Sequence, residues 1–258
     1  MIRSEIRAYI NIGSLVLVLL MNFLSNALPF NNLTQADLGQ LYPVLVTPAA
    51  YVFSIWGLIY LALIAFIVYQ ALPGYRENPV VKAVGILFAV SSLFNILWLF
   101  AWHYQRVGWS MIIMLLLLVT LIVIYLRIGA LTAEKTVFDR FLVKYPFSLY
   151  LAWITAATIV NLNVLLYDIG WLGTGGGGVL FTMLMIVVAA AVALVVFYLR
   201  QDYIYSLVFV WALVGIGVRH GTEIVILTVW AWIAAALILF FLGWITARNN
   251  DFSFRRSG

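Results

Sequence analysis

The run WSMIIMLLLLVTLIVIYLRIGA, residues 109–130, carries a single charged side chain, Arg127. A helix rises about 1.5 Å per residue, so about 20 apolar residues cross the hydrocarbon core of a bilayer. A membrane β-strand has about ten residues and alternates apolar with polar side chains. This run is longer and does not alternate, and it therefore predicts a membrane-spanning α-helix.

The rest of the chain has the same character. Apolar residues make up 66% of the 258 positions and charged residues 9%, against about 25% charged in an ordinary soluble domain. Because backbone groups in lipid must be paired within the protein, this composition predicts an all-α integral membrane protein. About eight runs are long enough to be transmembrane helices: 9–28, 49–72, 82–103, 109–130, 146–167, 178–199, 203–219 and 223–246.

Lys and Arg residues are distributed unevenly between these runs. Cytoplasmic loops are enriched in both residue types. The basic residues of one set of alternate segments are Arg3, Arg7, Arg76, Lys82, Arg127, Lys135, Arg140, Lys144, Arg200, Arg248, Arg255 and Arg256. The other set holds only Arg106 and Arg219. We therefore expect a multi-pass protein of the cell membrane with both termini cytoplasmic. The basic residues are scattered, so no nucleic acid is expected as a partner.

The first run has an alternative interpretation as a cleaved signal peptide. Arg3 and Arg7 precede it, and Ser25-Asn26-Ala27 resembles a cleavage site. The run is long enough to span a membrane, and we favour a retained helix.

A glycine-rich stretch, residues 173–178, separates two groups of runs. It contains no Lys or Arg, which a phosphate-binding loop would be expected to supply, and we interpret it as a flexible loop. The predicted organisation is a five-helix membrane domain, 1–170, the loop, 171–178, and a three-helix membrane extension with a short cytoplasmic tail, 179–258.

Groups that carry out catalysis are scarce within the predicted spans. The acidic residues fall in loops or at helix ends, and His103 and His220 lie at turns. The chain has no cysteine, and its two histidines lack the spacing of a metal site. Since intramembrane ionisable groups usually mark ion paths or proton relays, neither a proton-coupled pump nor an enzyme is expected.

Aromatic and amide side chains, in contrast, recur at helical spacing on three spans. Each stripe lies on one helix face. Together the stripes contain Phe53, Trp56 and Tyr60 on 49–72, Asn95, Trp98 and Trp102 on 82–103, and Tyr150, Trp153, Ala157 and Asn161 on 146–167. If the three faces converge, they enclose a slot that suits a planar apolar ligand. The alternative is structural, because Trp and Tyr anchor helices at membrane interfaces and Asn joins helices by hydrogen bonds.

The same segments resemble the tryptophan-rich sensory protein or translocator protein (TspO/MBR) family. The resemblance is carried by PAAYVFSIWGLIY at 48–60, FNILW at 94–98 and YLAWITAAT at 150–158 followed by Asn161, and it covers roughly 9–167. It implies a bundle of five helices, with a long first loop, here 29–48, capping a cavity for porphyrins, sterols or isoquinoline-type drugs. Three additional C-terminal helices indicate a longer branch of the family.

The chain departs from the family pattern at several positions. Phe53 and Trp56 are one residue closer than in typical short members, and Leu149 replaces the usual proline. Trp102-His103 stands where the family has two phenylalanines. Tyr167 is followed by Asp168 with no basic residue nearby, so the sterol-recognition pattern is missing and sterol binding is not expected.

The resulting functional hypothesis is a membrane receptor or carrier for a planar hydrophobic ligand such as a tetrapyrrole, with the ten stripe residues as its binding site. No other cofactor is expected. The partners expected are the lipid bilayer and the small ligand, with a homodimer left open. The alternatives are a noncatalytic scaffold, or subunit of a larger membrane complex, and an enzyme that degrades the tetrapyrrole.

Overall fold

A computed structural model describes residues 3–28, 30–33, 35–131 and 136–254. Three basic residues used above to predict the topology, Lys135, Arg255 and Arg256, lie outside this range. So do Pro29 and Thr34 of the predicted cap.

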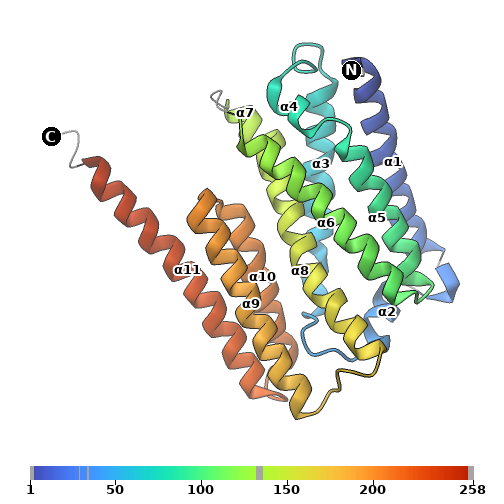
Figure 1. Cartoon of the computed structure of the whole chain (residues 1–258), viewed down its shortest axis with the longest axis vertical. Coiled ribbons are helices and arrows are strands. Elements are labelled where there is room, and N and C mark those ends of the chain that lie inside the picture. Colours follow the sequence, from blue (N-terminus) through green and yellow to red (C-terminus); the bar gives the residue numbers. More distant parts are fainter. Residues whose placement is uncertain (1–2, 29, 34, 132–135, 255–258) are drawn as a thin grey trace. The chain divides into compact units, whose positions relative to one another are not determined.

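The described residues form helices joined by short connections (Figure 1). Within the described ranges, seven helical segments are long and apolar enough to cross a membrane. They are α1 (Ser4–Ala27), η2 with α3 (Ala50–Ser54 and Ile55–Ala71), α6 (Val107–Gly129), α7, η3 and α8 (Val137–Asp139, Arg140–Lys144 and Tyr145–Asp168), α9 (Gly176–Arg200), α10 (Tyr203–His220) and α11 (Val225–Phe254). The chain is thus an all-α integral membrane protein, as predicted.

The remaining predicted span, 82–103, is the third in chain order, and its helix is shorter than expected. A six-residue helix, α4 (Pro79–Val84), ends at Gly85, and the 17-residue α5 (Leu87–His103) follows. Gly85 has φ +58° and ψ −141°, a positive-φ conformation that favours glycine and interrupts the helix. Its carbonyl accepts a hydrogen bond from Asn11 Nδ2 on α1, at 3.0 Å. The apolar segment continues through this break, so hydropathy alone does not reveal it.

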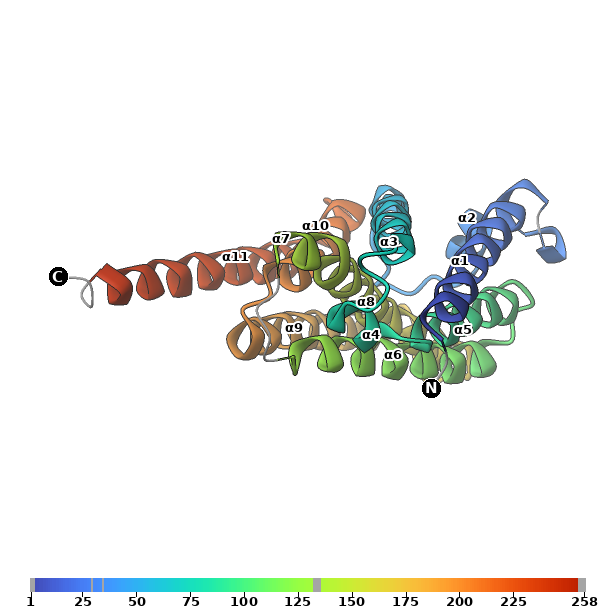
Figure 2. The same ribbon diagram turned by 90° about the horizontal axis from the view of Figure 1, so that it is seen from above.

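Two compact units make up the chain. The first is Met1–Val44 with Phe53–Gly173, and the second is Leu45–Val52 with Thr174–Gly258. In the first unit α1 contacts α3 and α5, α5 contacts α6, α6 contacts α8, and α8 contacts α3. These contacts close a ring of five helices in the order α1, α3, α8, α6, α5. Figure 2 shows these helices from above, with α3 nearly end-on and α6 running across the view. In the second unit α9, α10 and α11 contact one another pairwise.

The core of the five-helix unit is aromatic. Phe66 of α3 packs edge to face on Phe147 of α8, with ring centroids 5.0 Å apart, and Phe88 of α5 contacts both rings. All three side chains are fully buried. Perpendicular ring pairs are favoured by the aromatic quadrupole, so this cluster joins three of the five helices.

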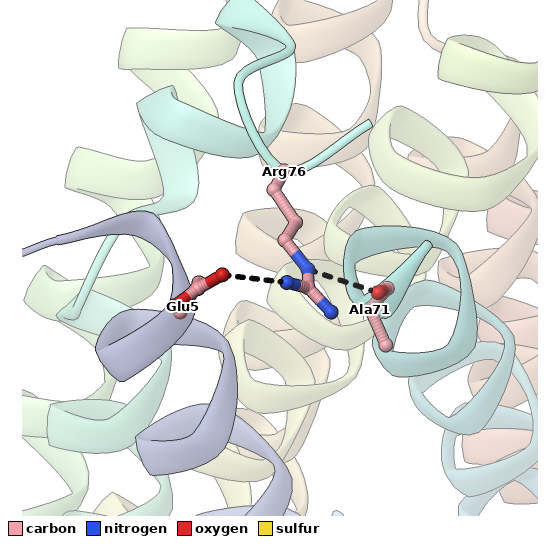
Figure 3. Close-up of polar contacts among 3 residues, drawn as sticks. All are labelled: Glu5, Ala71 and Arg76. Carbon is pink, nitrogen blue, oxygen red and sulfur yellow. Dashed lines mark hydrogen bonds and ion pairs between the residues drawn. The ribbon is translucent and has the colours of Figure 1, made fainter. Parts of the chain in front are cut away.

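Polar contacts connect α1 with the C-terminal end of α3 and the residues that follow it. Arg76 follows α3, and its Nε donates to the carbonyl of Ala71 at 3.0 Å while Nη1 lies 3.4 Å from a carboxylate oxygen of Glu5 on α1 (Figure 3). Arg7 of α1 donates to the carbonyl of Arg76. These contacts satisfy carbonyls that have no helical partner near the end of α3.

The first loop contains two short helices that lie against α5. These are η1 (Phe30–Asn32) and α2 (Gln35–Leu41). Phe30 stacks on Phe100 with ring centroids 5.2 Å apart, and Asn31 Nδ2 donates to the carbonyl of His103 at 3.2 Å. The later part of the same loop, 45–52, belongs to the second unit instead.

Candidate ligand-binding site

A cleft of about 380 Å³ lies on the five-helix unit between α1 and the beginning of α3. Its lining residues are Leu19, Asn22, Phe23 and Asn26 of α1, Phe53 of η2, and Trp56 and Tyr60 of α3. The positions on α1 follow the spacing i, i+3, i+4, i+7, which places them on one helix face. Phe53, Trp56 and Tyr60 have the spacing i, i+3, i+7 and form the facing stripe.

The aromatic wall of the cleft is supported from behind. Trp56 stacks on Tyr60 with centroids 5.4 Å apart, and its ring meets Tyr150 and Trp153 of α8 edge to face at 6.1 and 6.3 Å. Phe53 packs perpendicular to Trp153 at 5.8 Å. Tyr150 and Trp153 are buried, so α8 holds the indole of Trp56 in place before any ligand arrives.

Asn95 supports the other wall through hydrogen bonds. Its Nδ2 donates to the hydroxyl oxygen of Tyr150 at 3.1 Å, and its Oδ1 accepts from Asn22 Nδ2 at 3.3 Å. Asn95 is buried on α5. It therefore joins α1, α5 and α8 and fixes Asn22, which lines the cleft.

A separate cluster contains the remaining predicted indoles. Trp98 Nε1 donates to Asn161 Oδ1 at 2.9 Å, and Asn161 Nδ2 donates to Ser110 Oγ of α6 at 3.1 Å. Trp98 also stacks on Trp102 with centroids 5.8 Å apart, and Trp102 packs on Tyr42 of the first loop. This second cluster joins α5, α6 and α8, and none of its members lines the cleft.

The ten predicted site residues thus fall into groups. Phe53, Trp56 and Tyr60 line the cleft. Tyr150, Trp153 and Asn95 lie behind it, in contact with residues that line it. Trp98, Trp102 and Asn161 belong to the second cluster, and Ala157 is half-buried on α8 and does not line the cleft.

The contribution of α1 was missed by sequence reasoning. Leu19, Asn22, Phe23 and Asn26 supply one full wall, whereas the predicted slot used only the other three helices. Two asparagines four residues apart in an apolar span form a polar stripe that could have indicated this wall.

Hydrogen-bonding capacity remains in and behind the cleft. The side-chain nitrogens of Asn22 and Asn26 donate to backbone carbonyls of α1, at 2.9 and 3.0 Å. The indole Nε1 of Trp153, behind Trp56, is buried and has no hydrogen-bond partner in the described part of the chain. A buried donor without a partner costs free energy, so this indole is a latent donor beside the cleft.

The lining is uncharged. Two asparagines and the Tyr60 hydroxyl are its polar side chains, and the rest of it is apolar. Within the described residues no group of three His, Asp or Glu side chains is placed to hold a metal ion. The arrangement is suited to binding a flat neutral surface by stacking.

Fold and cleft together define a helical membrane protein with an aromatic cleft on a five-helix bundle. The model of the family described as "TSPO-like protein" matches residues 8–244 of the chain. The chain therefore belongs to this family. The matched range includes α9, α10 and most of α11. Comparison with curated proteins and with solved structures found no match.

Proposed function

We propose that the protein is a membrane receptor or carrier that binds a planar hydrophobic ligand of the tetrapyrrole type in the α1–α3 cleft. The observation that carries the proposal is the cleft itself, where three rings on one wall face two asparagines on the other. Its volume of about 380 Å³ lies in the lower part of the range of small-molecule sites, about 300–1,000 Å³.

The chemistry of the lining restricts the ligand. Stacking on Trp56 rewards a flat ring system, and the polar side chains that the lining offers to it, those of Asn22, Asn26 and Tyr60, are neutral. No cation lines the cleft, so carboxylate groups of a tetrapyrrole must remain in water, outside the cleft. The ligand therefore enters with its apolar edge first.

Titration with protoporphyrin, followed by quenching of tryptophan fluorescence, tests the proposal. We expect Trp56→Ala and Phe23→Ala each to weaken binding by about tenfold, because each removes a ring from the lining. Phe23 is 67% exposed, so its replacement leaves the helix packing intact. Trp109→Ala is the matched control, since Trp109 is 64% exposed and does not line the cleft.

Three results bear on the proposal. Equal affinities for the wild type, Trp56→Ala and Phe23→Ala would exclude the cleft as the site. Weakening by Trp109→Ala to the same extent would indicate nonspecific partitioning into the lipid phase. Selective weakening by the two cleft variants supports the proposal.

A second candidate is a noncatalytic scaffold or a subunit of a larger membrane complex. It is favoured by Asn95 and Asn161, whose amides are used to join helices. In that case Trp56→Ala lowers thermal stability with no ligand-dependent change, and the purified protein carries a stoichiometric partner. Binding that is confined to the cleft would exclude it.

The remaining parts of the proposal concern placement and chemistry. We place the protein in the cell membrane with both termini cytoplasmic, and we assign it no catalytic role, because the described residues that line the cleft include no Asp, Glu, His, Lys or Ser side chain. A homodimer is compatible with this function and is tested by the mass of the detergent-solubilised protein.

A further inference from the structure

One helix of the C-terminal unit binds the backbone of residues 45–52, here called the anchored segment. Four hydrogen bonds connect them within this unit. His220 Nε2 donates to the carbonyl of Leu45 at 2.7 Å, and Arg219 Nη1 donates to that of Thr47 at 2.8 Å. The amide of Ala49 donates to the Gly215 carbonyl at 3.0 Å, and Trp211 Nε1 donates to the Val52 carbonyl at 3.1 Å.

These hydrogen bonds follow a regular order along both α10 and the anchored segment. Trp211, Gly215 and Arg219 are four residues apart and share one face of α10. Their partners run in the opposite direction along the anchored segment, from Val52 back to Thr47. Carbonyls that are not paired within a helix need other partners when buried, and here the side chains of α10 supply them.

Steric fit supports the same contact. A Cβ atom on Gly215 would lie 2.1 Å from Val52 Cγ2 and 3.0 Å from Pro48 Cβ. Only glycine allows the segment to approach α10 this closely. Val46 and Val52 are buried, and Tyr51 packs perpendicular to Trp211 with centroids 5.2 Å apart. The contact is therefore specific in shape as well as in hydrogen bonding.

The anchored segment leads directly into the cleft wall. Val52, whose carbonyl is bound by α10, and Phe53, which lines the cleft, are consecutive residues of the short 3-10 helix η2. The helical run continues without a break from Ala50 to Ala71 and carries Trp56 and Tyr60. Val52 and Phe53 are joined by a peptide bond within one helical element, so restraint of the Val52 backbone also restrains that of Phe53.

We propose that the three C-terminal helices position the ligand-binding wall, with Trp211, Gly215, Arg219 and His220 acting on Phe53 and Trp56 through the anchored segment. They are positioning residues, since none of them lines the cleft. The inference deepens the proposed ligand-binding function and rests on it for its biological meaning, but the mechanical link can be measured without any ligand.

The test uses full-length protein in lipid nanodiscs and amide hydrogen exchange. Gly215→Ala should raise the exchange of residues 45–52 by about tenfold, because the new methyl group displaces Val52 and breaks the Ala49 hydrogen bond. Val52→Ala removes the clashing Cγ2, so the double variant should recover most of the protection seen in Val52→Ala alone. Gly243→Ala of α11 is the matched control, since its Cβ would meet nothing within 4 Å.

A second readout follows the cleft wall itself. The chain has no cysteine, so nitroxide labels on Ala27→Cys and Ser54→Cys, both exposed and neither lining the cleft, report the spacing of the two walls. We expect Gly215→Ala to broaden this distance distribution and to weaken protoporphyrin binding several-fold. Addition of Val52→Ala should restore both.

The outcomes separate the two proposals. Unchanged exchange in Gly215→Ala would overturn the anchoring, and faster exchange with unchanged label spacing would overturn the coupling to the cleft. If exchange and spacing both change but the wild type does not bind protoporphyrin, the positioning stands and the proposed ligand is wrong. Recovery by Val52→Ala distinguishes positioning from a general loss of stability.

Discussion

The indole of Trp153 meets that of Trp56 edge to face, with ring centroids 6.3 Å apart and planes at 86°. Trp153 Nε1 has no hydrogen-bond partner in the described part of the chain. Trp98 offers a direct comparison, because its Nε1 donates to Asn161 Oδ1 at 2.9 Å. One indole N–H is thus used to join helices and the other is not.

The first prediction compares these two indoles. Trp98→Phe should destabilise the protein by about 1 kcal/mol more than Trp153→Phe, because only Trp98 loses a hydrogen bond and Trp153 loses an unsatisfied donor. Thermal unfolding of both variants in the same detergent measures the difference. An equal loss of stability would mean that the N–H of Trp98 contributes nothing beyond ring packing.

The second prediction concerns the contact between Asn95 and Tyr150. A double-mutant cycle of Asn95→Ala and Tyr150→Phe should give a coupling energy of roughly 0.6 kcal/mol, the average for hydrogen bonds between membrane helices. The contact of 3.1 Å is buried between α5 and α8, which excludes competition from water. Additive effects of the two changes would contradict the assignment.

The third prediction concerns Asp139, a buried carboxylate at the end of α7. Its Oδ1 accepts from Tyr69 and Asn78 at 2.9 and 2.8 Å, and its Oδ2 accepts from the Thr136 amide and hydroxyl at 3.0 and 2.8 Å. An amide can replace only one of these oxygens as an acceptor. Asp139→Asn should therefore cost about 1.5–3 kcal/mol of stability, which unfolding in increasing denaturant measures.

A matched variant checks the same site. Tyr69→Phe removes one of the four donors and leaves the carboxylate with three, so its cost should be smaller than that of Asp139→Asn. The interpretation fails if the order is reversed.

The fourth prediction concerns membrane topology. Gly74 and Gly173 lie in exposed loops, and a Cβ atom at either meets nothing within 4 Å, so Gly74→Cys and Gly173→Cys should fold normally. In intact cells an impermeant maleimide should label Gly173→Cys and not Gly74→Cys, because basic residues follow Gly74 and none lies near Gly173. Permeabilised cells should label both, and the opposite pattern in intact cells would invert the proposed orientation.

Much of the architecture follows from hydropathy. The predicted runs 109–130 and 178–199 correspond to α6 (Val107–Gly129) and α9 (Gly176–Arg200) within two residues. Long apolar runs are matched to the thickness of the bilayer, which is a property of the chain segment alone. The helix break at Gly85 was not predicted, because its positive-φ backbone interrupts a helix without changing the apolar character of the run.

The sequence by itself determined an all-helical membrane protein and the helical stripes that carry aromatic and amide groups, because composition and periodicity are local properties. Only the tertiary structure decided which stripes meet. It paired Asn161 with Trp98 and Asn95 with Tyr150, brought Asn22 of α1 opposite Trp56, and assigned residues 45–52 to the C-terminal unit. These outcomes depend on contacts between residues far apart in the chain, such as Leu45 with His220, which no local pattern specifies.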